Sequence, residues 1–349
     1  MTKQSGRKIL ITGGAGFIGT NAVIHFLKKG WEVTVFDNFS RKGTDINLRF
    51  LEKNFSKGMK VVKGDVISED DVASVMKESF NVILHLAGQV AVTTSVTNPR
   101  EDFDVNALGT FNMLEAARKA SKPPLFLYSS TNKVYGGLES FSVKEEGDQY
   151  VFTEAKEGVS EEAPLDFHSP YGCSKGAADQ YVRDYARIYG LKTIVFRQSC
   201  IYGSHQMGIE DQGWVAWFMI AAILGKPITI YGNGKQVRDV LSVDDLVEVY
   251  TSAIDHIDRI AGKIYNIGGG AKNALSLLRF LDHLKNNLGL SVSPSFAATR
   301  PGDQPIFISN NALAKKDFGW EPKIGTEEGF RTLFAWLTEN RTLIEGLYR

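Results

Sequence analysis

A tyrosine and a lysine stand four residues apart in the segment Ser-Pro-Tyr-Gly-Cys-Ser-Lys, at positions 169–175. Ser169 is a good N-cap and Pro170 suits the first helical position, so a helix is expected to begin here. Tyr171 and Lys175 then lie on one face of that helix. A free tyrosine has a pKa of about 10, but a nearby ammonium group and the positive end of a helix favour the phenolate. The pattern therefore predicts Tyr171 as a general base, with Lys175 as its partner.

A second group of hydroxyl side chains follows an apolar run further upstream. Leu125–Ser129 is expected to form a buried strand, and the chain continues as Ser-Thr-Asn-Lys-Val-Tyr through positions 130–135. In open parallel sheets, ligands bind beyond the carboxyl ends of the strands. A hydroxyl there can hydrogen-bond a substrate oxygen and relay its proton, and Thr131 is the predicted residue. A strand end rich in Ser and Thr without a chemical role is the alternative.

The N-terminal part contains a glycine turn of the kind that binds dinucleotides. The expected strand Lys8–Thr12 runs into Gly-Gly-Ala-Gly-Phe-Ile-Gly at positions 13–19, and a helical pattern follows. Such glycines allow a tight turn, close approach of a pyrophosphate and close packing of helix on strand, and the helix N-terminus receives the phosphate charge. The predicted contacts are Gly13, Gly16, Phe17, Ile18 and Gly19. A glycine turn without a ligand is the alternative.

Two carboxylates come at the ends of the next two strands. Asp37 ends the second strand, about 20 residues after the glycine turn, where a carboxylate accepts the ribose hydroxyls. Because a carboxylate repels the 2′-phosphate of NADP, NAD is the predicted cofactor, while the nearby Arg41 and Lys42 keep NADP as an alternative. Asp65 follows the third strand and is predicted to meet the adenine amino group.

Strands and helices that must position these residues alternate along the first two-thirds of the chain. The expected strands are Lys8–Thr12, Glu32–Phe36, Met59–Lys63, Val82–His85, Leu125–Ser129 and Thr193–Gln198, and the expected helices are Phe17–Lys29, Glu69–Glu78, Asp102–Ala120 and Ser169–Tyr189. This alternation predicts an α/β fold with a Rossmann-type, doubly wound parallel sheet. After about residue 200 the rhythm changes, with a helix at Trp214–Leu224 and strands at Ile228–Tyr231 and Lys263–Ile267.

We therefore expect an NAD-binding Rossmann domain over residues 1–200 and a smaller C-terminal substrate-binding α/β region over residues 201–349. The boundary is approximate, and some strands are expected to exchange between the two. Residues 137–165 hold eight acidic and two basic side chains with little periodicity. They are expected to form an insertion loop, either a lid or a solvated surface excursion.

The composition argues against several classes of partner. The 349 residues carry 40 basic and 40 acidic side chains, so no net charge favours nucleic acid or a membrane surface. Two cysteines, Cys173 and Cys200, favour a reducing compartment. The first eight residues are polar, and no run of about 18 apolar residues occurs, so a cytoplasmic enzyme is expected. No metal site is predicted.

Taken together, the motifs resemble the extended short-chain dehydrogenase/reductases of the NAD-dependent epimerase/dehydratase family, over nearly the whole chain. The shared stretches are the glycine turn, Asp37-Asn38, Gly64-Asp65, His85–Gly88, Asn106, Ser129–Thr131, Tyr171 with Lys175, Val237–Asp239 and Arg300–Asp303. The resemblance implies that Thr131, Tyr171 and Lys175 are catalytic. It also implies contacts with NAD from Tyr171, Lys175, Asn38, Ser40, Arg41, Val66, Leu86, Ala87, Gln89, Asn106, Ser129 and Gln198.

Longer and less common strings resemble one branch of this family, the CDP-paratose 2-epimerases, also called tyvelose epimerases. They cover residues 85–91, 129–136, 166–181, 211–215 and 232–240. The implied substrate contacts are Gln89, Thr94, Lys133, His168, Cys200, Gln212, Trp214, Arg238 and Arg300. The two arginines match positions that hold the diphosphate, a task suited to a bidentate guanidinium. A structural hydrogen bond for His168 and a core position for Trp214 are the alternatives.

Two departures set the chain apart from other branches of the family. The 4,6-dehydratases follow the catalytic Thr with Asp-Glu, whereas Asn132 and Lys133 follow Thr131 here. UDP-galactose 4-epimerases usually have a Lys at the position of Val90 and an Asn at that of Cys200. Dehydration and 4-epimerisation are therefore less favoured.

The resemblance thus implies an NAD-dependent nucleotide-sugar 2-epimerase of the CDP-paratose to CDP-tyvelose type. Oxidation at C2 by NAD⁺ would give a 2-keto sugar, and reduction of the opposite face would invert the carbon. The alternatives are a 2-epimerase of another nucleotide sugar, a UDP-sugar 4-epimerase, a dehydrogenase that releases NADH and a non-catalytic NAD-binding sensor. A homodimer or homotetramer is expected, through helices Asp102–Ala120 and Ser169–Tyr189.

Overall fold

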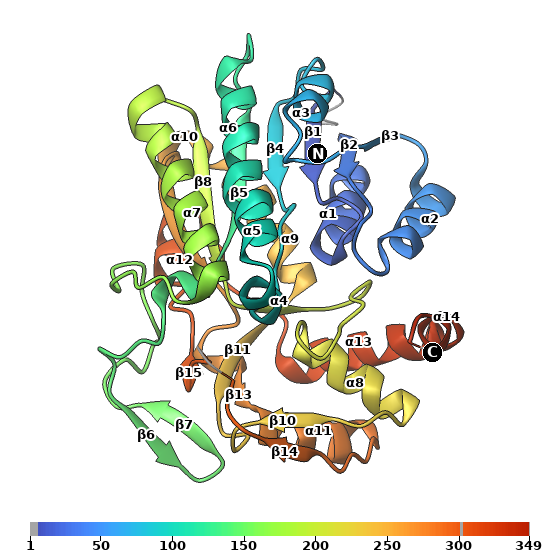
Figure 1. Cartoon of the computed structure of the whole chain (residues 1–349), viewed down its shortest axis with the longest axis vertical. Helices are drawn as coiled ribbons and strands as arrows, with labels where there is room; N and C mark the ends of the chain where they lie inside the picture. The colour runs from blue at the N-terminus through green and yellow to red at the C-terminus, as the bar shows by residue number, and fades with distance from the viewer. Residues whose placement is uncertain (1–5, 301–302, 349) are drawn as a thin grey trace. The chain divides into compact units, whose positions relative to one another are not determined.

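The computed structural model describes residues 6–300 and 303–348 (Figure 1). Contacts between Cα atoms divide the chain into two compact units. Unit 1 comprises the chain up to Thr131, Ser169–Arg197 and Val247–Tyr265, and unit 2 comprises Asn132–His168, Gln198–Leu246 and the chain from Asn266 onward. The two units alternate along the sequence, whereas the expected division has a single boundary near residue 200. Residues 132–168 belong to unit 2, and residues 247–265 belong to unit 1.

Unit 1 is built on a seven-stranded sheet in the order β12-β8-β5-β4-β1-β2-β3. The strands are β1 (Lys8–Thr12), β2 (Glu32–Asp37), β3 (Met59–Lys63), β4 (Val82–His85), β5 (Leu125–Thr131), β8 (Thr193–Gln198) and β12 (Lys263–Ile267). The pairings of β1 with β2 and β4, of β2 with β3, and of β4 with β5 are parallel. Leu10, Ile83 and Phe126 are fully buried at its centre. This confirms the predicted doubly wound, Rossmann-type fold.

Helices complete unit 1. They are α1 (Phe17–Lys28), α2 (Thr44–Phe55), α3 (Glu69–Val75), α4 (Val92–Thr97), α5 (Pro99–Phe103), the π-helix η1 (Asp104–Leu108), α6 (Gly109–Lys119), α7 (Ser169–Tyr189), most of α9 (Val243–Asp255) and α10 (Ile257–Ile260). Figure 1 shows α6 and α7 side by side, and the two helices are in contact. Over the described residues, no helix is long and apolar enough to cross a membrane.

The helix predicted at Asp102–Ala120 is wrong in its boundaries. The helical path starts earlier, at Pro99, because the Asn98 side chain caps it by accepting a hydrogen bond from the Glu101 amide. It is then interrupted by the π-helix at Asp104–Leu108. A wider turn of this kind often marks a functional position. Two other ends also differ, since α3 stops at Val75 and β5 extends to Thr131.

Unit 2 contains smaller sheets. One joins β9 (Cys200–Tyr202), β11 (Val237–Ser242), β13 (Ala274–Ser276) and β15 (Ile306–Phe307), a second joins β10 (Thr229–Tyr231) and β14 (Ser295–Ala297), and a third joins β6 (Val143–Glu146) and β7 (Gln149–Phe152). The helices are η2 (Asn132–Tyr135), α8 (Trp214–Leu224), η3 (Ala271–Asn273), α11 (Leu277–Leu288), α12 (Ala312–Phe318), α13 (Thr326–Glu339) and α14 (Arg341–Leu347). One core gathers around Phe280 and Phe330 and another around Tyr135 and Phe307.

The acidic insertion at residues 137–165 is not the loop that its irregular pattern predicts. Its middle forms the antiparallel hairpin of β6 and β7, and Leu138, Phe152 and Val159 are buried in the second core. Exposed acids also find basic partners in the same unit, since Asp148 pairs with Arg279 at 3.0 Å. Phe152 is the one buried residue in the two short strands β6 and β7, so the sequence gives a weak period-two signal and does not predict the hairpin.

Candidate active site

The glycine turn between β1 and α1 has the geometry that a dinucleotide phosphate needs. Gly13 has φ +67°, and a Cβ there would lie 2.8 Å from the amide nitrogen of Ala87. A Cβ on Gly19 would lie 2.1 Å from the carbonyl oxygen of Gly13. Side chains at either position would block the turn, so helix α1 can approach β1 closely and direct its first N–H groups at the turn. Phe17 and Ile18 begin this helix and are half-buried.

The predicted ribose and adenine carboxylates lie at the carboxyl ends of β2 and β3. Asp37 is 8% exposed and accepts hydrogen bonds from the amides of Ala15 at 3.0 Å and Phe39 at 2.8 Å. Burial raises the pKa of Asp37, and the charge of Asp65 adds to this. Asn38 links the two by donating to Asp65 at 2.8 Å, and Ser40 donates to Asn38. The carboxylates are thus positioned beside the glycine turn by local backbone contacts.

Other predicted NAD contacts are distributed around the same edge of the sheet. The amides of Leu86 and Ala87 donate to the hydroxyl of Thr12 at 3.2 and 3.1 Å. Val66 is buried beneath Gly109 of α6, and Arg41 is exposed. Gln198 is buried at the end of β8 and belongs to unit 2. The prebuilt glycine turn with its adjacent carboxylate fits an NAD diphosphate and ribose.

The side chains of Tyr171 and Thr131 are hydrogen-bonded to each other, which joins α7 to the end of β5. Ser169 begins α7 with φ +66°, and its hydroxyl accepts from the amide of Gly172 at 3.2 Å, as an N-cap does. Both Tyr171 and Thr131 are only 7% exposed. Burial raises the pKa of Tyr171 to about 12, and the charge of Asp102 adds to this, while the hydrogen bond with Thr131 and the charge of Arg41 lower it.

Lys175 lies one turn further along α7. Its ammonium donates to the carbonyl oxygen of Ser129 at 2.5 Å and lies 4.4 Å from the ring centre of Tyr128. Burial lowers the pKa of Lys175 to about 7, and the charges of Asp179 and Asp102 oppose that shift. The structure therefore brings together the three residues that the sequence predicts to be catalytic. A hydroxyl, a phenol and an amine in this arrangement can hold and move a proton.

In unit 2, two of the predicted substrate contacts converge on one carboxylate. Arg238 donates to Asp303 at 2.6 Å, and the ammonium of Lys133 lies 4.0 Å from the same oxygen. Burial and the charge of Arg238 lower the pKa of Lys133 to about 8, while Asp303 opposes this. Cys200 shares this environment, because burial raises the pKa of its thiol while Arg238 and Lys133 lower it. This cluster presents two cations held by one acid.

The second predicted arginine also has an acidic partner in unit 2. Arg300 pairs with Asp211 at 2.9 Å, and its guanidinium carbon lies 3.8 Å from the ring centre of Tyr231. Trp214 begins α8, where its ring contacts Phe218 and Phe280, as the core alternative expects. The neighbouring Gln212 is paired with Ile209 through backbone hydrogen bonds. Pro301 and Gly302 of the arginine motif lie outside the described residues.

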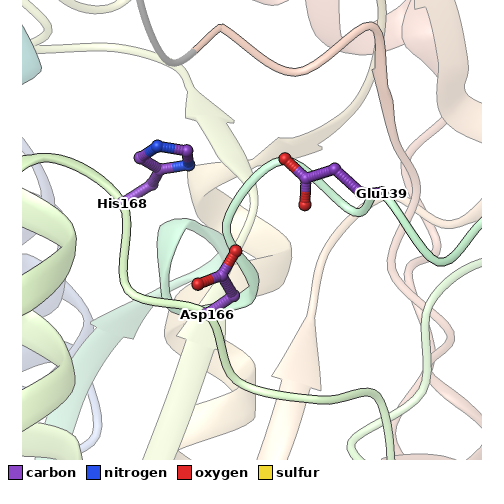
Figure 2. A group of neighbouring side chains, drawn as sticks. All are labelled: Glu139, Asp166 and His168. Atoms are coloured by element: carbon purple, nitrogen blue, oxygen red, sulfur yellow. The ribbon is translucent and has the colours of Figure 1, made fainter.

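Three further substrate predictions have different surroundings. His168 is exposed in unit 2, and Figure 2 shows its ring facing the carboxylates of Glu139 and Asp166. One ligand atom from each of these residues lies within 4.8 Å of the others. Thr94 is exposed on α4 of unit 1. Gln89 is held by its own neighbours, since its amide donates to the carbonyl oxygen of Ala91 and to Asp102.

Three acids of the candidate site received no role from the sequence. Asp211 and Asp303 stand within strings that resemble known relatives, but nothing in their spacing reveals that each pairs with an arginine. Asp102 is fully buried, and it contacts Gln89, Asn106 and Ser174. Its position four residues before Asn106 is the one signal that places both side chains on a shared helix face.

The family model for the NAD dependent epimerase/dehydratase family matches residues 9–268. The chain belongs to that family. It is 43% identical over 337 residues to a CDP-paratose 2-epimerase of Salmonella typhi, a match that covers 94% of this chain and 98% of the relative. The chain is thus an NAD-dependent enzyme of this family, as predicted.

Solved structures of relatives superpose over nearly the whole chain. A UDP-glucose 4-epimerase of Thermotoga maritima, solved with UDP-glucose, gives a TM-score of 0.81 at 29% identity and covers 96% of this chain and 99% of its own. A UDP-glucose 4-epimerase of Thermus thermophilus, solved with NAD, gives 0.78 at 30% identity, with 95% and 99% covered. Both relatives share the fold of this chain, and the Thermus thermophilus enzyme was solved with NAD.

Proposed function

We propose that this enzyme inverts C2 of a CDP-activated sugar, converting CDP-paratose to CDP-tyvelose. The observation that carries the proposal is the 43% identity to a CDP-paratose 2-epimerase across nearly the full length of both chains. The proton-handling group of Thr131, Tyr171 and Lys175 supports a reaction in which a hydroxyl becomes a ketone and returns to a hydroxyl. Asn132 and Lys133 supply no acid and base for dehydration.

In this reaction, Tyr171 acts as the base. With a pKa of about 12, Tyr171 is a phenol near pH 7, and the positive charge of oxidised NAD would favour its phenolate when the cofactor is bound. The phenolate then removes the proton of the C2 hydroxyl while Thr131, which is hydrogen-bonded to Tyr171, orients the same oxygen. The ammonium of Lys175, fixed on the carbonyl oxygen of Ser129, stabilises the phenolate. When bound, NAD supplies the hydride acceptor and donor. After the sugar has turned its other face, Tyr171 returns the proton to the oxygen of C2.

The cations of unit 2 are proposed to bind the diphosphate of the substrate. Arg238 and Arg300 offer bidentate guanidinium groups, and Lys133 adds a point charge. Cys200, Gln212 and Trp214 are the neighbouring residues proposed to contact the rest of the nucleotide sugar. Firm diphosphate anchoring would let the uncharged sugar turn without release of the nucleotide.

A homo-oligomer is also proposed. Helices α5, α6 and α7 carry hydrophobic residues with 39% to 65% relative exposure, namely Phe103, Phe111, Tyr181 and Ile188. Phe111 and Tyr181 form one aromatic contact, with ring centres 5.9 Å apart. An apolar helix face of this kind suits pairing with a second copy. Cytoplasmic localisation stays a prediction.

A product assay tests the proposed reaction. The purified enzyme is incubated with CDP-paratose in deuterated water without added NAD, and products are read by NMR. CDP-tyvelose with hydrogen retained at C2 is expected. Deuterium at C2 would instead indicate deprotonation at carbon. No conversion of any C2 pair, with conversion of UDP-glucose to UDP-galactose, would replace the proposal by 4-epimerisation, the second candidate, which the similarity to UDP-glucose 4-epimerases favours.

A further inference from the structure

A buried carboxylate lies beside the candidate catalytic pair without a place in the mechanism above. Asp102, on α5, is fully buried. One of its oxygens accepts hydrogen bonds from the side-chain amides of Gln89 at 2.8 Å and Asn106 at 3.1 Å. The other oxygen accepts from the hydroxyl of Ser174 at 2.5 Å. Ser174 stands immediately before Lys175 on α7, so this network joins the acid to the catalytic helix.

The three donors to Asp102 are neutral groups, so no cation among the described residues is hydrogen-bonded to its carboxylate. Burial raises the pKa of Asp102, while these hydrogen bonds and the charge of Lys175 lower it. Asp179, the other acid near Lys175, does have a hydrogen-bonded cation. Asp179 receives two hydrogen bonds of 2.9 Å from Arg197, and their side chains are 0% and 3% exposed. A buried charge balanced by a bidentate partner has a weak field at a distance, whereas one held by neutral dipoles acts at full strength.

Two acids supply negative charge that favours the ammonium of Lys175, Asp179 with the larger effect and Asp102 with the smaller. The titratable and charged groups near Lys175 are Tyr171 and Asp179 on α7, Tyr128 on β5, His85 on β4, Arg197 on β8 and Asp102 on α5, and Arg41 in the loop after β2 acts on Tyr171. Burial raises the pKa of Tyr128 well above its usual value and lowers that of His85 to about 3, so both are neutral near pH 7. Of the two acids that favour the ammonium, Asp102 is therefore the one whose carboxylate has no cation hydrogen-bonded to it in the described part of the chain.

We propose that Asp102 is a positioning residue whose buried carboxylate keeps Lys175 protonated beside Tyr171. Two parts of the structure support this. The hydrogen bonds from Gln89, Asn106 and Ser174 fix the carboxylate at one place, and its charge then opposes the loss of the Lys175 proton that burial promotes. The proposal rests on the proposed function only for the catalytic role of Tyr171 and Lys175. The protonation of Lys175 itself can be measured without a substrate.

The Asp102→Asn variant isolates the charge from the hydrogen bonds. The amide oxygen of asparagine can still accept from Gln89 and Asn106. Its amide nitrogen can donate to Ser174, whose hydroxyl can turn to the carbonyl oxygen of Tyr171, 3.2 Å away. The matched control is Asp104→Asn, because Asp104 lies two residues further on and pairs with the exposed Arg100.

The test follows the side-chain amine of Lys175 by NMR in NAD-loaded enzyme with ¹³C-labelled lysine, and K175M assigns the signal. In D102N the titration midpoint is expected about one pH unit lower than in wild type, a tenfold loss of proton affinity, while D104N leaves it unchanged. An unchanged midpoint in folded D102N would overturn the proposal. If D102N does not fold, D102S supplies a second uncharged side chain with room for water, and the same two outcomes decide.

A kinetic measurement separates this proposal from the proposed function. With CDP-paratose, the alkaline limb of kcat/KM in D102N is expected to move to lower pH by the same amount. Wild-type enzyme that does not epimerise CDP-paratose would refute the substrate and leave the lysine titration to decide the role of Asp102. A lower kcat with an unmoved alkaline limb would mean that Asp102 acts only as a structural acceptor, against the proposal.

Discussion

The two units hold their functional cations in different ways. In unit 1, Lys175 donates to a backbone carbonyl and lies over an aromatic ring. In unit 2, the cations proposed to bind the substrate are already engaged by acids. Asp303 holds Arg238, and Asp211 holds Arg300. The group that must move a proton makes its direct contacts with neutral groups, whereas carboxylates pair directly with the groups that must bind an anion.

This difference has consequences for each step. A proton-handling group with neutral partners needs no counter-ion to leave before it acts, which is a form of preorganisation. A cation with a carboxylate partner must exchange that partner for the phosphate, so part of the attraction is offset. Such exchange favours ligands with more charge than one carboxylate, and a diphosphate meets this condition. Five changes test the contrast, from the largest expected effect to the smallest.

Replacing Tyr171 by Phe is expected to lower kcat by about 10²- to 10⁴-fold, the usual contribution of a general base. Phe keeps the buried ring, so the unfolding midpoint should stay close to that of wild type. The control is Tyr185→Phe on the same helix, where the lost hydroxyl only donates to Glu115. Comparable kcat values in Y171F and Y185F would contradict the role of Tyr171.

Replacing Arg197 by Met is expected to destabilise unit 1 strongly. It leaves the carboxylate of Asp179 buried without its partner, at a cost of about 3–5 kcal/mol. Urea unfolding followed by circular dichroism measures the loss. The double variant R197M/D179L removes both charges and should recover a large part of it. A loss below about 1 kcal/mol in R197M would show that the pair is not a structural anchor.

Replacing Asp303 by Asn should free Arg238 and Lys133 for an anionic ligand. Affinity for CDP, measured by calorimetry at pH 7, is expected to rise by about threefold to tenfold, because the ligand no longer displaces a carboxylate. Asp148→Asn, on the hairpin, controls for the change in net charge. Weaker binding in D303N would mean that Asp303 contacts the ligand itself and would break the proposed exchange.

The sequence predicts unit 1 far better than unit 2, and the reason is physical. The glycine turn, Asp37 and the Tyr171–Lys175 pair depend on contacts within a few residues or on strand ends, so spacing alone brings them together. The strand-end argument likewise places Thr131 at the end of β5, where it is hydrogen-bonded to Tyr171, because parallel strands end at the same edge of a sheet. The pairing of Arg238 with Asp303, 65 residues apart, follows from tertiary packing that no local pattern encodes.

The acid Asp102 and the hairpin illustrate two further limits. The π-helix at Asp104–Leu108 changes which side chains face the site, and helical periodicity does not predict such a bulge. The hairpin at 143–152 is acidic in sequence. The basic side chains that pair with it, Lys235 and Arg279, come from later parts of the chain. In both cases the missing information is the identity of a distant partner.

Lys133 gives the cation cluster of unit 2 a pH dependence. Its pKa is lowered to about 8, so the ammonium is charged below that pH and is lost as pH rises through it. Affinity for CDP is therefore expected to fall about fivefold between pH 7 and pH 9, the effect of losing one charge worth roughly 1 kcal/mol. Calorimetry on wild type and on K133M, which should show a flat profile, checks this. An equal pH dependence in both would assign the effect to another group.

The smallest effect is expected where an ion pair is most exposed. The side chains of Asp148 and Arg279 are 41% and 47% exposed, so Asp148→Asn should change the free energy of unfolding by at most about 1 kcal/mol. Phe152→Ala, which removes a buried ring from the same hairpin, should cost about 3–5 kcal/mol. Urea unfolding of both variants distinguishes two ways of holding the hairpin. If D148N costs as much as F152A, the exposed ion pair stabilises the hairpin as strongly as its buried ring does. Exposure would then no longer distinguish this ion pair of unit 2 from the buried pair of Arg197 and Asp179 in unit 1.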